Sequence, residues 1–214
     1  MLHELVRPLL EPAFTVGGTP TSWGEVLGFG TGVLTVWLVV RQHIANWGVG
    51  IVNVVILGLI FLDSGLYADA SLQIVYVVLG LYGWWTWLYG GEGRTVRLVQ
   101  RTAAAEWAGI AVGVVAATAL MTWVLVEFTE STVPFWDALT TALSLAATYG
   151  QCRKLVESWI LWITVDLIYV PLYAYKGLYL TGALYVIFLA LCVAGLRAWR
   201  RDLTVRAAAL PAAA

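Results

Sequence analysis

The residues best suited to bind a small molecule lie in one apolar stretch, Trp159 to Tyr185, which carries an aspartate among aromatic side chains. At about 100° per residue, a helix places five of its side chains within about 80° of one another. These five are Trp159, Trp162, Asp166, Tyr169 and Tyr173. An acid near the centre of a membrane-spanning helix costs about 2.5 to 3.5 kcal/mol, so it usually faces a cavity or a partner. We predict that Asp166 lines a binding site; a helix-packing hydrogen bond is the alternative.

A second polar face is expected on the apolar segment 70–89. Its members fall within roughly 100° on a helix. They are Gln73, Tyr76, Gly80, Gly83, Trp84 and Trp87. Because Trp84, Trp85 and Trp87 cluster at one end of the segment, we interpret that trio as an interfacial aromatic belt. The preceding segment, 47–63, adds Trp47 and Asn53 as further candidates.

Amide and carboxylate groups beside indole and phenol rings suit a flat heterocycle, because they offer hydrogen bonds at its edge and π-surfaces on its faces. Enzyme motifs are missing from the sequence: it has no HExxH, no GxSxG and no GxxxxGK[ST] pattern. Two cysteines and two histidines predict neither a disulfide framework nor a metal site. We expect a binding protein without a cofactor and not an enzyme.

The composition indicates an integral membrane protein, since 61% of the residues are hydrophobic and only 12% are charged. A net charge of −1 argues against nucleic acid as a partner. Seven apolar segments have the length of a bilayer-spanning helix. They lie near 23–40, 47–63, 70–89, 105–127, 135–151, 159–175 and 180–199.

An internal duplication groups these segments. Shifting the numbering by 112 residues lays Trp159 on Trp47, Gly195 on Gly83 and the run from Gly177 to Tyr179 on the run from Gly65 to Tyr67. We predict an all-α fold of two parallel three-helix repeats joined by a linker helix. The expected parts are an N-terminal extension (1–22), a first repeat (23–89), a loop with the linker helix (90–134), a second repeat (135–200) and a tail (201–214).

Charged residues predict the orientation of the chain in the membrane. Ten of the twelve Lys and Arg residues fall on one side of the predicted spans, and only Arg7 and Lys176 fall on the other. Acidic residues, including Glu130, gather on that other side. By the positive-inside rule, the N-terminus lies outside the plasma membrane and the C-terminus is cytoplasmic.

Two motifs resemble those of the PnuC-type vitamin transporters: the WxxWxxxD run Trp159, Trp162, Asp166, and the run from Leu72, Gln73 and Tyr76 to Gly83, Trp84 and Trp87. The resemblance covers residues 23–200 and implies a fold similar to that of the SWEET transporters, assembled as a homotrimer. It implies facilitated diffusion of nicotinamide riboside, trapped inside by a cytoplasmic kinase. The substrate site that it implies consists of Trp159, Trp162, Asp166, Gln73 and Tyr76, to which we add Asn53, Trp47 and Tyr169.

Several alternatives remain open at this point. Sister groups of that family carry thiamine, riboflavin or deoxynucleosides, and a sugar carrier of SWEET type is a further possibility. A seven-helix receptor without transport is a rival of another class. A retinal protein is disfavoured because the last span carries no lysine for a Schiff base.

Overall fold

The computed structural model describes residues 2–16, 19–129, 131–175 and 179–209. The chain divides into two compact units, Met1–Trp85 and Thr86–Ala214. Eight α-helices make up most of the described residues. Lys176, Gly177, Leu178 and Glu130, which entered the predicted topology, lie outside the described residues.

The first unit is built on two antiparallel neighbours, α2 (Trp23–Val40) and α3 (Ala45–Asp63), with most of α4 (Tyr67–Tyr89) beside them. A capping box begins α2: the Ser22 hydroxyl accepts from the Glu25 N–H at 3.2 Å, and Glu25 accepts from the Ser22 N–H at 2.7 Å. Small residues allow close approach between helices, since a Cβ on Gly80 would lie 2.9 Å from the Ile51 side chain.

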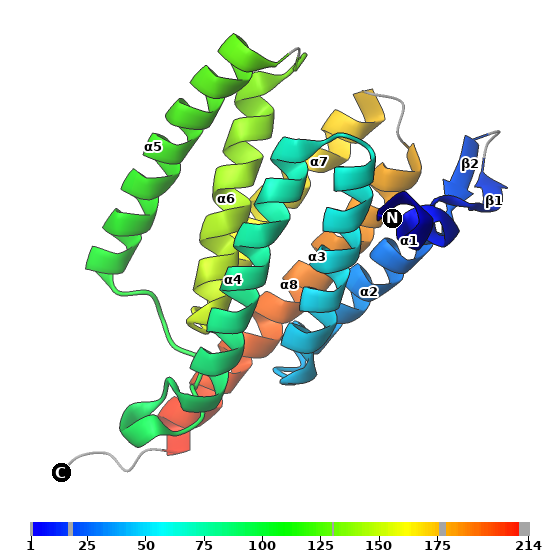
Figure 1. Ribbon diagram of the computed structural model, residues 1–214. Helices are drawn as coiled ribbons and strands as arrows, with labels where there is room; N and C mark the ends of the chain where they lie inside the picture. The colour runs from blue at the N-terminus through cyan, green and yellow to red at the C-terminus, as the bar shows by residue number, and fades with distance from the viewer. Residues whose placement is uncertain (1, 17–18, 130, 176–178, 210–214) are drawn as a thin grey trace. The chain divides into compact units, whose positions relative to one another are not determined.

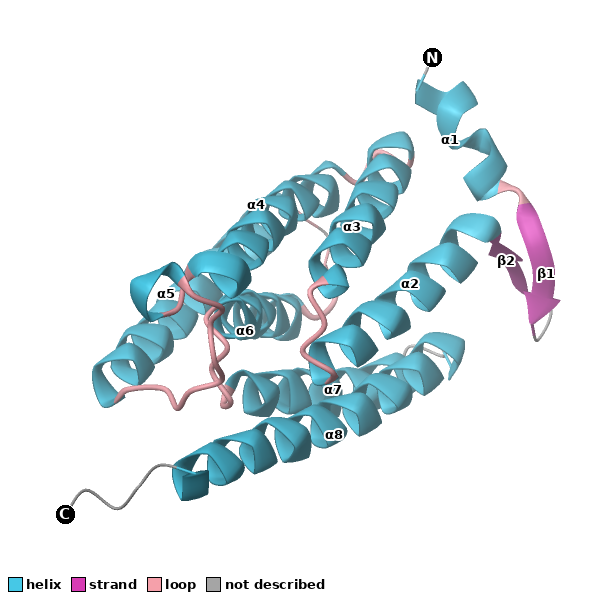
Figure 2. Cartoon of the chain, turned by 90° about the horizontal axis from the view of Figure 1, so that it is seen from below, coloured by secondary structure: helices cyan, strands magenta, loops and turns pink. Residues whose placement is uncertain are grey.

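A short N-terminal cap precedes α2 and adds a pair of strands to the otherwise helical chain. Helix α1 (Leu2–Leu10) contacts α2 and α3. Strands β1 (Pro12–Val16) and β2 (Thr19–Ser22) then form an antiparallel pair at the start of α2 (Figures 1 and 2). Residues such as Thr15, Val16 and Thr21 are β-branched and favour strands, and Pro12 and Pro20 interrupt any helix.

The second unit contains the short helix η1 (Glu92–Arg94) and four long helices, α5 (Ala104–Phe128), α6 (Pro134–Cys152), α7 (Ser158–Tyr175) and α8 (Tyr179–Ala209). Contacts run from α5 to α6, from α6 to α7 and from α7 to α8. Helix α5 lies along the outer side of α6 (Figure 1), which leaves α6 enclosed between two neighbours.

Each of the seven predicted spans forms a helix, and five of the described helices are long and apolar enough to cross a membrane: α2, α3, α5, α7 and α8. Helix α6 is more polar because it carries a row of hydroxyl side chains. Those groups are satisfied within the helix: Thr140 donates to the Trp136 carbonyl and Thr148 to the Ser144 carbonyl, both at 2.8 Å. Because α6 is largely buried among its neighbours, its polar residues need not face lipid.

Two turns, one in each unit, make the same contacts at an offset of 112 residues. Gln42 and Lys154 both adopt a left-handed backbone, with φ of 53° and 50°. The side chain of Asn46 donates to the His43 carbonyl at 2.7 Å, and the hydroxyl of Ser158 donates to the Leu155 carbonyl at 2.7 Å. The helix bounds obey the same offset to within one residue, from α2 to α6 and from α3 to α7.

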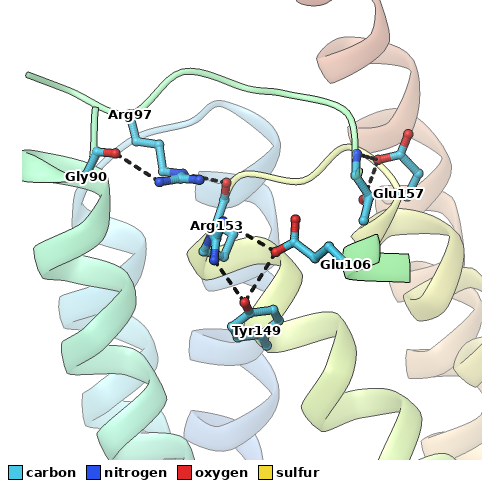
Figure 3. Close-up of polar contacts among 7 residues, drawn as sticks. Gly90, Arg97, Glu106, Tyr149, Arg153 and Glu157 are labelled. Carbon is cyan, nitrogen blue, oxygen red and sulfur yellow. Dashed lines mark hydrogen bonds and ion pairs between the residues drawn. The ribbon is translucent and has the colours of Figure 1, made fainter. Parts of the chain in front are cut away.

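The loop after α4 is fastened to the turn between α6 and α7, as Figure 3 shows. Arg97 donates from Nε to the Arg153 carbonyl at 2.7 Å and from a terminal nitrogen to the Gly90 carbonyl at 2.9 Å. Gln100 pairs with Leu155 as an isolated parallel bridge. Glu157 accepts from both the N–H and the hydroxyl of Thr102 at 2.8 Å. These bonds hold residues 90–103 against the beginning of α7.

Helix α8 continues past the predicted end of the second repeat. The span was expected to end near residue 199 and to be followed by a tail, but the helix runs to Ala209. Asp202 and Arg206, one helical turn apart, form an ion pair there, and alanines follow them. Both features favour a helix, so the last nine residues of α8, 201–209, extend beyond the predicted end of the second repeat.

Candidate functional site

Asp166 is the central residue of the candidate site, and it lies in the middle of α7 with only 2% of its surface exposed. Its carboxylate shares a hydrogen bond with the thiol of Cys192 on α8. Among the residues that the structure describes, no donor reaches Asp166 Oδ2. A buried carboxylate oxygen without a donor is costly, and such groups mark the places where a ligand, an ion or water completes the bonding.

Two indole N–H groups on the same helix are also buried without a partner among the described residues. Trp159 is fully buried and Trp162 is half-buried, and within the described part of the chain neither Nε1–H has an acceptor. Trp159, Trp162 and Asp166 are spaced at i, i+3 and i+7, which places them on one face of α7. That face therefore carries two donors and one acceptor without partners among the described residues, and two indole rings.

Tyr169 continues this face and joins a cluster of aromatic rings. Its centroid lies 5.3 Å from that of Tyr173 and 4.7 Å from that of Tyr185 on α8. The rings of Tyr173 and Tyr185 are stacked at 5.1 Å, and Phe188 lies edge-on to Tyr185. The Tyr169 hydroxyl bonds to Thr140 on α6, and the Tyr173 hydroxyl to Tyr185. Three helices of the second unit thus contribute to the site.

In the first unit, the structure engages two predicted site residues in helix packing. The amide of Asn53 donates to the Gly28 carbonyl at 2.8 Å and to the Thr31 hydroxyl at 2.7 Å, both on α2. The indole of Trp47 is 7% exposed and lies so close to Gly83 that an added Cβ there would sit 2.2 Å from it. These contacts fix α3 between α2 and α4.

Gln73 and Tyr76 lie on α4 and are both half-buried. The stem of Gln73 packs on Gly58 of α3, where an added Cβ would lie 3.3 Å from Gln73 Cβ. The first two carbons of the Gln73 side chain therefore lie against α3. Within their own unit, the two residues lie one helical turn apart on α4.

The interfacial interpretation of the tryptophan trio is wrong for one member. Trp84 and Trp85 are 39% and 59% exposed, but Trp87 is only 2% exposed. Its Nε1 donates to the Gln151 carbonyl at 2.8 Å, and its ring lies 6.2 Å from that of Trp199. Trp87 is buried because the folded-back loop and α8 cover it, which helical periodicity alone does not reveal.

Lys154 lies over the same indole, with Nζ 4.3 Å from the centre of the Trp87 ring. The side chain is only 4% exposed. Burial lowers the pKa of Lys154 to about 8; Arg206 lowers it further and Asp202 opposes the shift. This cation–π contact makes Lys154 part of the packing of the second unit and not a surface charge.

Sequence reasoning missed Tyr185 and Cys192, both of which contact the site from α8. The duplication contained a signal for the first of them. At the offset of 112 residues, Tyr185 occupies the position of Gln73, and Phe188 occupies that of Tyr76. The polar face that was identified on α4 thus has an aromatic counterpart on α8. No comparable signal marked Cys192, since a lone cysteine in an apolar helix is usually a packing residue.

The chain resembles known membrane transporters along most of its length. A family model described as nicotinamide mononucleotide transporter matches residues 22–201. The chain is 29% identical over 209 residues to the nicotinamide riboside transporter PnuC of Escherichia coli, covering 86% of this chain and 87% of that relative. It is 32% identical over 198 residues to the riboflavin/roseoflavin transporter RibM of Streptomyces davaonensis, covering 89% and 92%.

A solved structure agrees with the fold. The crystal structure of the vitamin B3 transporter PnuC matches with a TM-score of 0.66 at 24% identity, covering 85% of this chain and 82% of that one. At that identity the match shows the fold and does not identify the ligand.

Proposed function

Because the chain belongs to the nicotinamide mononucleotide transporter family, whose members are membrane transporters and not enzymes, we propose that it imports nicotinamide riboside. The observation that carries the proposal is the buried carboxylate of Asp166, whose Oδ2 lacks a donor among the described residues. Nicotinamide riboside carries a fixed positive charge on a flat pyridinium ring. An uncompensated acid beside indole rings suits that charge and that shape.

In the proposed site, the pyridinium ring stacks on the indole of Trp162 while Asp166 compensates its charge. The Nε1–H groups of Trp159 and Trp162 supply donors for the oxygen atoms of the substrate. Tyr169 extends the aromatic lining, and Gln73 and Tyr76 are proposed to contribute from the first repeat. Asn53 and Trp47 are proposed to support the site by holding α3, in line with their packing contacts.

We further propose that the transporter works by rocking two parallel three-helix repeats, α2–α4 and α6–α8, joined by α5. The matching turns at residues 41–47 and 153–159 support this division, since they repeat hydrogen bond for hydrogen bond. The N-terminus is proposed to lie outside and the C-terminus in the cytoplasm, on the charge distribution. Pro171 inside α7 removes one backbone hydrogen bond and supports bending there.

Transport is proposed to be facilitated diffusion, with a cytoplasmic kinase that phosphorylates the vitamin and so prevents its return. A homotrimer with one pathway in each protomer is the proposed assembly. Both proposals rest on the resemblance to PnuC-type transporters.

Isothermal titration calorimetry on purified protein tests the substrate. Nicotinamide riboside, thiamine, riboflavin and glucose are titrated separately into the wild type and into Trp162→Ala. We expect nicotinamide riboside to bind with a micromolar dissociation constant, about −8 kcal/mol, and Trp162→Ala to lose that binding. Tighter binding of another ligand, or binding of nicotinamide riboside that is unchanged in Trp162→Ala, would contradict the proposal.

Riboflavin is the second candidate, and the 32% identity to RibM favours it. The isoalloxazine ring is flat but uncharged, so it would leave the charge of Asp166 without a counterion. A riboflavin carrier therefore predicts that replacing Asp166 with asparagine preserves or improves binding. A carrier of a cationic ring predicts that the same substitution weakens the binding of its substrate.

A further inference from the structure

Three tyrosines and a second acid lie between the end of the second unit's helix bundle and Asp166. Asp137 is in the first turn of α6, and Tyr173 lies near the end of α7. The negative charge of Asp137 acts on the hydroxyl groups of Tyr169 and Tyr173, and that of Asp166 on those of Tyr169 and Tyr185. The tyrosine rings therefore lie between two carboxylates, those of Asp137 and Asp166.

The spacing along α7 shows that the tyrosines extend from Asp166 toward the C-terminal end of this helix. Asp166 and Tyr173 are seven residues apart on one helix face, which corresponds to about 10 Å along the axis. Tyr169 lies between them, and Tyr185 of α8 contacts both Tyr169 and Tyr173. The tyrosines therefore lie along α7 between Asp166 and the end of the helix that faces the first turn of α6.

The ring geometry fits a flat cation. The rings of Tyr169, Tyr173 and Tyr185 have centroids 4.7 to 5.3 Å apart, and two of the pairs are stacked. Aromatic faces near a carboxylate bind cationic rings by combining the ring quadrupole with the negative charge. A neutral flat ring gains the stacking but not the electrostatic contribution.

Asp137 also has a local structural role. Its carboxylate accepts from the Ser131 hydroxyl at 2.8 Å. Its counterpart in the first repeat, Glu25, is engaged in the capping box with Ser22. The side chain of Asp137 is shorter and half-buried, and it lies within electrostatic range of two tyrosine hydroxyls. A test must therefore separate the charge of Asp137 from its hydrogen bond with Ser131.

We propose that Asp137, Tyr173 and Tyr185 form a second subsite, at the outer end of the pathway, that selects flat cationic heterocycles before they reach Asp166. This inference rests on the proposed function and on the proposed orientation, in which the first turn of α6 faces outward. The subsite raises the local concentration of a cationic substrate, so its effect is on KM and not on the maximal rate.

The test compares two substrates of nearly the same shape and different charge: nicotinamide riboside, which is a cation, and its reduced dihydro form, which is neutral. Initial uptake rates into proteoliposomes are measured for the wild type, Asp137→Asn and Asp137→Glu. Asparagine keeps an acceptor for Ser131 and removes the charge. We expect Asp137→Asn to raise the KM for the cation about tenfold, to leave the KM for the neutral form unchanged, and Asp137→Glu to stay near the wild type.

The matched control is Glu127→Gln, which removes the same charge from an exposed position at the end of α5. Tyr173→Phe removes the hydroxyl and keeps the ring, so it should preserve the preference for the cation, whereas Tyr173→Leu should reduce it. An unchanged KM for the cation in Asp137→Asn, or an equal rise for both substrates, overturns the subsite and leaves the proposed function intact. A wild type that transports neither substrate overturns both.

Discussion

The indole of Trp159 lies directly against Gly195, where an added Cβ would sit 2.5 Å from Trp159 Cζ2. Trp47 and Gly83 make the same contact in the first unit, at 2.2 Å. In both cases a large ring on one helix, α7 or α3, fills the space that a glycine leaves on the next helix, α8 or α4. The two pairs are 112 residues apart in sequence, so the duplicated motif is a packing unit of helix against helix.

Replacing Gly195 with alanine should destabilise the protein. The nearest atoms belong to a fully buried indole and not to the end of a flexible chain, so the ring must move. We expect a loss of about 1–3 kcal/mol, partly offset by the better helix propensity of alanine. Thermal unfolding in detergent measures it. Gly30→Ala is the control, because nothing lies within 4 Å of that Cβ, and it should be neutral or stabilising.

Asn53→Val should lower stability more than it alters transport. The change removes the bonds to Gly28 and Thr31 and introduces the residue that the second repeat carries at this position, Val165. We expect a loss of about 1–3 kcal/mol in the free energy of unfolding. Melting temperature and the KM for nicotinamide riboside are measured together. A large rise in KM at an unchanged melting temperature would instead place Asn53 in contact with substrate.

The stability of the protein should rise between pH 8 and pH 10.5, because burial lowers the pKa of Lys154 from 10.5 to about 8. In that range the folded state binds fewer protons than the unfolded state, so raising the pH favours folding. The gain should be on the order of 2 kcal/mol. Tryptophan fluorescence melts at pH 7.5 and 9.5 measure it, and Lys154→Met should lack the gain. An equal pH response in the variant would exclude Lys154 as its source.

Glu157→Ala should loosen the loop that precedes α5. Its carboxylate accepts both bonds from Thr102, and its removal leaves a backbone N–H without that partner (Figure 3). We expect a local cost of about 1–2 kcal/mol and faster amide exchange across residues 97–103. Hydrogen exchange with mass spectrometry tests this, with Glu92→Ala in the same loop as the control. Unchanged exchange in Glu157→Ala would show that Arg97 and Gln100 hold the loop without it.

Sequence reasoning predicted the helices well because their cause is local. Apolar runs between charged turns determine α2 to α8, and the duplication repeats the signal of α2–α4 in α6–α8. It was less successful where tertiary contacts decide. The burial of Trp87 depends on a loop that folds back onto the turn after α6. The extra length of α8 has a local cause, the Asp202–Arg206 pair beyond the apolar run, which a search for apolar spans does not detect.

For the candidate site, the acid and its neighbouring indoles were recognisable in the sequence as candidates because a carboxylate in an apolar helix is conspicuous. Tyr185 was not, because a tyrosine in an aromatic-rich helix carries no such contrast. It becomes recognisable only from its contacts with α7, or because it corresponds to Gln73 at the sequence offset of 112 residues.

The most direct test of the account is uptake of radiolabelled nicotinamide riboside into proteoliposomes by the wild type and by Asp166→Ala. Because Asp166 Oδ2 has no donor among the described residues, the substitution removes a costly buried charge, and the melting temperature should not fall. We predict wild-type uptake that saturates and at least a tenfold loss of initial rate in the stable variant. Wild-type uptake by a well-folded Asp166→Ala protein would contradict the account.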